Sequence, residues 1–330
     1  MKALVHEVKT GIEGLAVREM ELPEPGKNEV RIRLKSAGMN HRDLITLERH
    51  KETEPPLVIG SDGAGIIDAV GHGVNELSVG QEVIINPGIG WKNNSDAPPE
   101  GFEILGHPSN GTFAQYVIVP AENALPKPGF LTWEEAGVLS LAALTAFRVL
   151  FTRAKIREGM KIFIPGIGGG VATFMLQMAK AVGATVYVSS RSEQKCKRAL
   201  ELGADKAFDS NSDWAEALSG EKVDVVIESI GAATFNKSLA CLRPGGTIVT
   251  FGASAGDVVD FNLRSFFYGQ FNMLGSTMGS AEEYREMLAF IEKHGVRPVI
   301  EGMFPLEEYG RAFDLLEKAE QLGKVGFVID

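Results

Sequence analysis

Hydrophobic and polar positions follow two different patterns along the chain. Up to residue 122 the apolar positions come in short runs with turn residues between them. These runs are NEVRIRLK (28–35), GAGIIDAVG (63–71), QEVIINP (81–87) and TFAQYVIVP (112–120). Short apolar runs bounded by Gly and Pro are typical of β-strands. Residues 1–122 are therefore expected to form a compact, mostly antiparallel domain.

The second pattern, an alternation of strands and helices, is assigned to residues 123–278. It becomes clear from Leu131, where the segment LTWEEAGVLSLAALTAFRVLF begins. Buried strands are expected at KIFIPG (161–166), TVYVSS (185–190), VDVVIES (223–229) and GTIVTFG (246–252), with helices at 171–183 and 193–203. Such alternation predicts a parallel, doubly wound sheet, so the chain is expected to be an α/β protein.

The last part, residues 279–330, is expected to contain two helices and a final strand. The helices are predicted at 280–294 and 307–320, and the chain closes on VGFVID. This last strand is expected to return to the first domain. The predicted division is therefore 1–122, 123–278 and 279–330.

The strongest chemical signal is the glycine-rich segment IPGIGGGVATF (164–174), which joins a predicted strand to a predicted helix. Glycines at such a turn let backbone N–H groups approach a pyrophosphate, and the helix N-terminus favours its negative charge. The spacing departs from GxGxxG, because Ala172 takes the last small position. The strand, loop, helix and second strand together still indicate a dinucleotide site. Its expected contacts are Gly166, Gly168, Gly169, Gly170 and Val171.

The end of the second strand of this unit indicates which dinucleotide is bound. A site for NAD would place an acidic residue there to hold the ribose 2′-OH. This chain instead has Ser189, Ser190 and Arg191, with Lys195 one turn later. Hydroxyl, guanidinium and ammonium groups suit a 2′-phosphate, so NADP(H) is the expected cofactor. The alternative is that Ser190 caps the next helix and that Arg191 is solvated surface.

Composition and charge exclude several other classes of protein. The net charge of −10 argues against a nucleic-acid partner, which would require a basic face. No apolar stretch is long and unbroken enough for a membrane span or a signal peptide. The only cysteines, Cys196 and Cys241, lack CxxC spacing, which fits a reducing compartment. A cytoplasmic protein that acts on a small molecule is expected.

The chain as a whole resembles the medium-chain dehydrogenase/reductase superfamily. The resemblance rests on the glycine loop and on four further segments: AGMNHRDL (37–44), VIGSDGAGIIDAVG (58–71), SLAALTAF (140–147) and LRPGGTIVTFG (242–252). It is similar in particular to the quinone and enone reductase branches and to zinc-type alcohol dehydrogenase-like proteins. The resemblance implies a GroES-like catalytic domain made from both chain ends, with a Rossmann domain inserted between them. It also implies hydride transfer between NAD(P)H and a carbonyl compound, alcohol, quinone or activated alkene.

The same resemblance provides a test for zinc. Zinc-containing members place Cys where this chain has Asn40, and His-Glu where it has Ser61 and Asp62. The segment expected to supply a third ligand, 131–151, contains neither Cys nor His, and the region matching the structural-zinc lobe, 86–108, has no cysteine. Zinc needs three or four converging N, S or O ligands. No metal site is therefore expected.

Without zinc, other groups must stabilise the negative charge that develops on the acceptor oxygen. The resemblance implies catalytic roles for Asn40, whose amide can donate a hydrogen bond, and for His41 and Arg42 beside it. Arg42 stands where zinc members have a small hydroxyl residue that relays a proton. Further cofactor contacts are expected from loops at the carboxyl ends of strands and from matching family positions, namely Thr145, Phe251, Gly252 and Lys324.

The expected function is a zinc-independent, NADPH-dependent reduction of a quinone, enone or similar activated carbonyl compound. Two alternatives stay open, an NADP-dependent alcohol dehydrogenase or carbonyl reductase, and a non-enzymatic NADPH-binding protein. The resemblance also implies a homodimer or homotetramer, in which QFNMLGSTM (270–278) pairs as the final strand of two sheets. Pairing of this kind would close an apolar edge that otherwise invites aggregation.

Overall fold

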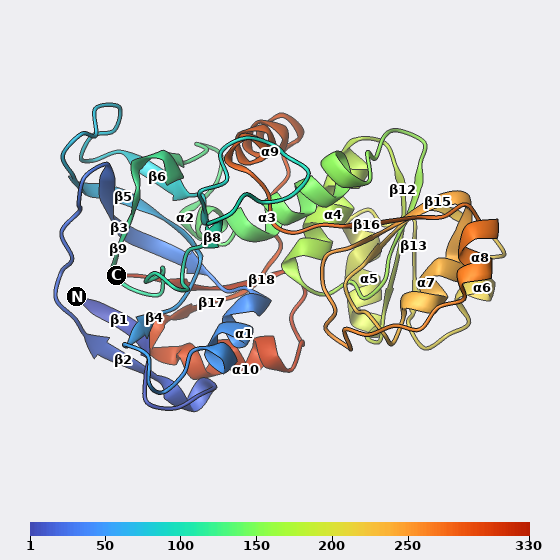
Figure 1. The fold of residues 1–330 in the computed structure, drawn as a ribbon, viewed down its shortest axis with the longest axis horizontal. Coiled ribbons are helices and arrows are strands. Elements are labelled where there is room, and N and C mark those ends of the chain that lie inside the picture. Colours follow the sequence, from blue (N-terminus) through green and yellow to red (C-terminus); the bar gives the residue numbers. More distant parts are fainter. The chain divides into compact units, whose positions relative to one another are not determined.

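The computed structural model describes residues 1–330, which divide into two compact units. The first unit contains Met1–Leu144 and Gly279–Asp330, and the second contains Thr145–Met278. Figure 1 shows the elements in chain order, from blue to red. None of the helices has both the length and the apolar character that crossing a membrane requires.

The first unit is built mainly from antiparallel β-structure, as the sequence predicts. Its seven-stranded sheet has the order β10-β6-β5-β3-β18-β17, with β9 also paired to β3. These strands are β3 (Glu29–Gly38), β5 (Asp62–Val70), β6 (Glu82–Ile85), β9 (Tyr116–Pro120), β10 (Ala124–Pro126), β17 (Ile300–Pro305) and β18 (Lys324–Val328). A three-stranded sheet, β2-β1-β4, contains β1 (Lys2–His6), β2 (Leu15–Glu19) and β4 (Leu57–Val58), and a two-stranded sheet pairs β7 (Gly88–Ile89) with β8 (Glu103–Ile104).

The first unit also contains short helices. They are α1 (His41–Arg49), α2 (Trp133–Gly137), α9 (Ala281–His294) and α10 (Tyr309–Glu317), with single 3-10 turns at η1 (Ile12–Gly14), η2 (Ala121–Asn123) and η4 (Leu306–Glu308). Both chain ends contribute to one hydrophobic core, which includes Ile32 of β3, Phe113, Phe313 of α10 and Phe327 of β18. The predicted return of the last strand is confirmed, because β18 pairs antiparallel with β3 and parallel with β17.

The boundary between the two units lies later than the sequence pattern places it. Helix α2 packs against β3 so closely that a Cβ on Gly38 would come within 2.6 Å of Val138. The Ser36 hydroxyl also donates a hydrogen bond to the carbonyl of Trp133. Residues 123–144 therefore belong to the first unit. The apolar, helical character of this segment resembles that of the Rossmann helices, which is why the pattern alone assigns it to the second unit.

The second unit is the predicted doubly wound parallel sheet, and the α/β fold class is confirmed. Its six strands have the order β13-β12-β11-β14-β15-β16 and are all parallel. They are β11 (Lys161–Ile164), β12 (Thr185–Ser190), β13 (Lys206–Asp209), β14 (Val223–Glu228), β15 (Leu242–Thr250) and β16 (Asn272–Gly275). The strand order reverses between β11 and β14, which is the place where sheets of this type bind dinucleotides.

Helices connect successive strands of this sheet. They are α4 (Gly170–Ala181), α5 (Glu193–Glu201), α6 (Trp214–Ala217), α7 (Phe235–Cys241) and α8 (Leu263–Tyr268), while α3 (Ser140–Phe147) and a π-helical turn, η3 (Arg148–Arg153), lead into the unit. Strand β16 lies at the open edge of the sheet, as predicted, and Met273 on it is 39% exposed. The predicted strand β16 therefore has a free side in the single chain.

Candidate functional site

The strand register of the first unit explains why distant residues meet near Asn40. Strands β5 and β18 both run antiparallel to β3, so each of them begins where β3 ends. In this register Gly38 pairs with both Asp62 and Gly326. The end of β3, the start of β5 and the start of β18 therefore bring Asn40, Asp62 and Lys324 together.

Asn40 is the N-cap residue of α1, and its side-chain amide also contacts residues of two strands. The turn is closed by Asp43, whose Oδ2 accepts a hydrogen bond of 2.7 Å from the Asn40 backbone N–H. The Asn40 amide donates from Nδ2 to Asp62 Oδ2 at 3.0 Å and accepts at Oδ1 from Lys324 Nζ at 2.6 Å. Two buried, opposite charges thus fix which way the amide points.

Lys324 is the buried cation of this cluster. Its side chain is 3% exposed, and the Asp62 side chain is fully buried. The ammonium group donates to Met39 O at 2.7 Å, to Asn40 Oδ1 and to Asp62 Oδ2 at 3.1 Å. An ammonium has three N–H donors, so all three are used inside the first unit. The prediction that Lys324 contacts the cofactor stays a prediction, and the observed contacts give the residue a positioning role.

Arg42, in the first turn of α1, forms a second cationic contact. Its Nη1 donates to Ser61 Oγ at 2.6 Å and to Leu105 O at 3.1 Å, and Ser61 Oγ donates in turn to Leu105 O at 2.7 Å. Partial burial lowers the pKa of Arg42, although the nearby Asp43 and Asp62 carboxylates oppose this effect. Burial raises the pKa of Asp43 itself to about 6, against the charge of Arg42. His41, beside Arg42, is exposed.

The residues at the positions of the zinc ligands do not suit a metal cation. The lone pairs of Asn40 Oδ1 and Ser61 Oγ already accept hydrogen bonds from Lys324 and Arg42. Both donors are positively charged, so Zn²⁺ would be repelled where it would have to bind. In residues 1–330 no three His, Cys, Asp or Glu side chains come together in a way that could hold a metal. Two fixed cations, Arg42 and Lys324, therefore contact Ser61 and Asn40, the positions at which the resemblance implies metal ligands in zinc members.

The glycine loop of the second unit has the geometry of an anion site. Gly166 adopts a left-handed φ of 73°, and a Cβ there would meet the Ile230 side chain at 2.8 Å. Gly169 directly precedes α4, and Gly170 and Val171 begin the helix. Ile167 N donates to Ser189 O at 2.7 Å, which fastens the loop to the end of β12. The loop therefore leads straight from β11 into a helix N-terminus, as predicted.

The expected 2′-phosphate contacts lie at the end of β12 and the start of α5. The alternative role for Ser190 is wrong, because Ser192 caps α5 by accepting a hydrogen bond from Lys195 N at 3.3 Å. Ser190 is buried, and its hydroxyl accepts a hydrogen bond from Ser192 N at 3.2 Å. Arg191 is exposed in the turn between the two elements. Of the two basic residues, Arg191 thus lies in the turn before α5 and Lys195 in the first turn of that helix.

The remaining predicted contacts lie at different depths in the second unit. Thr145 is 6% exposed in α3, and Phe251 follows β15, where its N–H donates to Glu228 O at 3.2 Å. Gly252 lines a cavity of about 250 Å³ at the carboxyl end of β15, together with Thr250, Gly231 and other residues. Glu228 is fully buried at the end of β14 and accepts hydrogen bonds from Ile230 N, Gly231 N, Thr234 Oγ1 and Ser238 Oγ.

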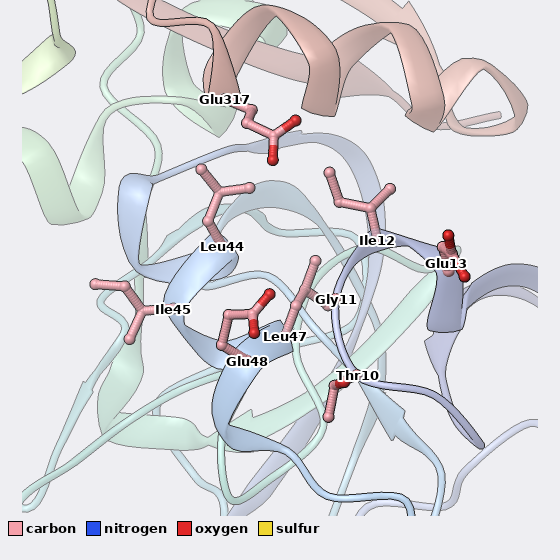
Figure 2. A pocket seen from close by; sticks show the side chains of 9 residues that line it. All are labelled: Thr10, Gly11, Ile12, Glu13, Leu44, Ile45, Leu47, Glu48 and Glu317. Carbon is pink, nitrogen blue, oxygen red and sulfur yellow. The ribbon is translucent and has the colours of Figure 1, made fainter.

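A larger cavity, of about 600 Å³, lies elsewhere in the first unit (Figure 2). Its walls combine aliphatic side chains of α1 and η1 with three carboxylates, and they consist of Thr10, Gly11, Ile12, Glu13, Leu44, Ile45, Leu47, Glu48 and Glu317. None of the predicted site residues lines it. The size of a cavity therefore does not identify the candidate site in this protein.

Two family models match the two parts of this architecture. The alcohol dehydrogenase GroES-like domain matches residues 26–129, and the zinc-binding dehydrogenase domain matches residues 170–293. The fold, the glycine loop and these matches define an oxidoreductase that uses a nicotinamide cofactor. The chain belongs to the medium-chain dehydrogenase/reductase superfamily.

Individual relatives place the chain more closely. It is 34% identical to a zinc-type alcohol dehydrogenase-like protein of Schizosaccharomyces pombe, with 100% of this chain and 99% of the relative covered. A solved NAD-dependent alcohol dehydrogenase has 34% identity and a TM-score of 0.92, with both chains covered completely. A crotonyl-CoA carboxylase/reductase, AntE, solved in complex with NADP, has 25% identity and a TM-score of 0.89 over 100% of this chain and 94% of that one. This chain is thus similar both to alcohol dehydrogenases and to a crotonyl-CoA carboxylase/reductase.

Proposed function

We propose that this protein is a zinc-independent, NADPH-dependent oxidoreductase that transfers hydride to a quinone, enone or similar activated carbonyl compound. The observation that carries the proposal is that two fixed cations contact residues at the positions of the zinc ligands: Arg42 donates to Ser61, and Lys324 donates to Asn40. The likeness to a reductase of an enoyl thioester supports this acceptor class. A cytoplasmic location is part of the same proposal.

The proposed residues for holding the cofactor are those of the strand-to-helix turns in the second unit. The N–H groups around Gly168, Gly169 and Gly170 and the positive end of α4 suit the pyrophosphate. Ser190, Arg191 and Lys195 suit the additional 2′-phosphate of NADPH. Thr145, Phe251 and Gly252 are proposed as further contacts. When bound, NADPH supplies the hydride for the reduction.

The proposed catalytic groups act on the acceptor oxygen. Hydride addition to the β-carbon of an enone moves an electron pair onto this oxygen, and the resulting enolate then takes up one proton. Arg42 uses only Nη1 in its contacts with Ser61 and Leu105, which leaves the N–H groups on Nε and Nη2 for the oxygen. Asn40 retains a second Nδ2–H beyond the one that Asp62 accepts. His41 is exposed and is proposed to contact the cofactor or the acceptor.

The test of this proposal is the oxidation of NADPH with a panel of quinones, enones, alkenals and aldehydes, combined with zinc analysis of the purified protein. We expect turnover with at least one quinone or enone, substoichiometric zinc, and unchanged rates after chelator treatment. One tightly bound zinc per chain with alcohol oxidation would instead identify an alcohol dehydrogenase. Tight NADPH binding without turnover on any acceptor would identify a non-enzymatic NADPH-binding protein.

Replacing Arg191 by Ala should weaken NADPH binding and leave NADH binding nearly unchanged. A hydrogen bond to a charged group contributes about 1.5–3 kcal/mol, so the dissociation constant for NADPH should rise about 10–100-fold. Fluorescence titration with both cofactors measures the effect. Lys197→Ala is the matched control, because Lys197 is an exposed cation on α5, the helix that follows Arg191, and lies outside the proposed contacts. Equal losses for NADPH and NADH would contradict the assignment of Arg191.

We also propose a homodimer or homotetramer that forms through β16. This strand is the edge of the six-stranded sheet, and the neighbouring Phe267 and Tyr268 are 51% and 72% exposed. The opposing interpretation, in which the aromatic side chains all pack within one subunit, fits Phe266 and Phe271, which lie against the core. It does not fit Phe267. A paired edge would remove the exposed strand that favours aggregation.

A further inference from the structure

Two buried histidines of the first unit contact each other directly, away from the predicted catalytic residues. His6 is the last residue of β1, and His50 is the residue that follows α1. Their Nδ1 atoms are 2.7 Å apart, and both residues are buried, His6 with 1% and His50 with 4% of its surface exposed. On the outer sides, His6 Nε2 lies 3.1 Å from Gly11 O and His50 Nε2 lies 2.9 Å from Pro55 O. The two rings therefore link three segments of the chain through three contacts.

Counting protons shows that two neutral rings do not satisfy these contacts. A carbonyl oxygen only accepts, so each Nε2 must carry a proton. A neutral imidazole has one proton, and both protons of a neutral pair are then used in the outer contacts. The two Nδ1 atoms would face each other with lone pairs at 2.7 Å. Moving one proton inward would instead leave Gly11 O or Pro55 O opposite a bare ring nitrogen.

We infer that His6 and His50 form a buried proton-binding site, in which one additional proton is shared between the two Nδ1 atoms at neutral pH. The pair then carries one positive charge and makes all three hydrogen bonds. Neither residue belongs to the candidate catalytic site or to the proposed cofactor site. The ligand of this site is the proton itself.

The surroundings favour one charge on the pair and oppose a second. His50 lies at the C-terminal end of α1, where the helix dipole stabilises a cation. Burial is the main factor that lowers the pKa of His6, and repulsion from His50 lowers it further, while the Gly11 carbonyl and Glu48 raise it. Double protonation is therefore unfavourable. The charged side chains on the packed segments are Glu7, Lys9, Glu13, Glu48, Arg49, Lys51, Glu52 and Glu54.

The pKa of one of these carboxylates, the exposed Glu54, is affected by the charge of His50. The pKa of Glu54 is lowered, mainly by a hydrogen bond from Lys51 N–H and in smaller part by the charges of His50 and His107. Glu48 and Gly11 both line the 600 Å³ cavity (Figure 2). The Gly11 carbonyl also contacts His6 Nε2, so one residue is shared by the cavity wall and the histidine pair. Acidic side chains thus outnumber basic ones on the segments that pack around the pair.

The pair gives α1 a fixed end. Arg42 lies in the first turn of α1 and Asn40 precedes it, whereas His50 ties the other end of the same helix to β1 and to the segment before β4. His6 and His50 are therefore positioning residues for the catalytic groups, a consequence that rests on the proposed function. Loss of the shared proton should loosen this end of the helix without removing any group from the catalytic site.

The test is ¹⁵N NMR of the imidazole nitrogens in the full-length protein over a pH titration. Between about pH 7 and 8, where an ordinary histidine is neutral, we expect two protonated Nε2 signals and two Nδ1 signals with intermediate shifts that report one shared proton. If the folded pair keeps a proton that the histidines of the unfolded chain release, this proton contributes stability at lower pH, and the contribution is lost on the alkaline side as the proton leaves the pair. Nδ1 signals of an unprotonated pair at pH 7 would overturn the inference.

His50→Asn is the matched variant. The Asn Nδ2 takes the place of the ring Nδ1 and donates to His6 without an additional proton, so the alkaline loss of stability should disappear. His6 should then remain a single neutral Nε2–H tautomer over the same pH range. If this variant does not fold, the wild-type NMR spectrum still decides the question. Neither the NMR spectrum nor the stability measurement depends on turnover. The inference can therefore be tested even if the proposed enzyme activity is not found.

Discussion

Lys324→Met should destabilise the first unit by about 3–5 kcal/mol, which is the usual cost of removing one partner of a buried ion pair. Lys324 is 3% exposed, and its loss leaves the fully buried Asp62 carboxylate without its cation. The same change removes the donor to Asn40 Oδ1 and to Met39 O. Chemical denaturation followed by circular dichroism measures the difference in the free energy of unfolding.

The matched control is Lys318→Met on the segment after α10. Lys318 is exposed and paired only with Asp314, so its replacement should leave the unfolding free energy nearly unchanged. Adding Asp62→Leu to Lys324→Met should recover part of the lost stability, because the unpaired buried charge is then removed as well. An unfolding free energy of Lys324→Met equal to that of the wild type would contradict the assignment of a buried ion pair.

Arg42→Met should reduce turnover far more than it weakens NADPH binding. Removing one donor to a developing oxyanion typically lowers kcat by about 10²–10³-fold. Met keeps much of the apolar volume of the side chain but has no N–H group. Steady-state kinetics with the best acceptor from the screen and NADPH titration by fluorescence measure the two effects separately.

Arg49→Met is the control for this change, because Arg49 is an exposed cation in the last turn of the same helix. It should keep the wild-type kcat. Arg42→Lys should give an intermediate kcat, since an ammonium keeps the charge but loses the planar set of donors. A kcat for Arg42→Met within about twofold of the wild type would show that Arg42 only holds Ser61 and the Leu105 carbonyl in place.

Local patterns predicted the parts of the fold that depend on local interactions. The strands β11 and β12, the glycine loop and α4 follow from apolar runs, glycines and helical spacing, and the structure confirms them. The contacts of Lys324 depend on strand pairing between residues nearly a whole chain apart. The local pattern of apolar residues does not specify which distant strands pair or in which register, so these contacts could not be predicted from it. The cap of α5 could not be predicted because Ser190 and Ser192 are both near the helix start, and the sequence does not show which of them ends the strand. The His6–His50 contact joins residues 44 positions apart, which no local pattern relates.

The placement of β18 between β3 and β17 has a consequence for the order in which the protein folds during synthesis. Lys324 makes its contact with Met39 across a sequence separation of 285 residues. The first unit therefore cannot complete its sheet or pair its buried Asp62 until the C-terminal strand has left the ribosome. The second unit is one continuous segment and has all its strands earlier. Domains fold as units while the chain grows, so the inserted second unit should form first. The amino-terminal strands should remain unpaired at one edge for the longest time, and chaperones should bind them during this time.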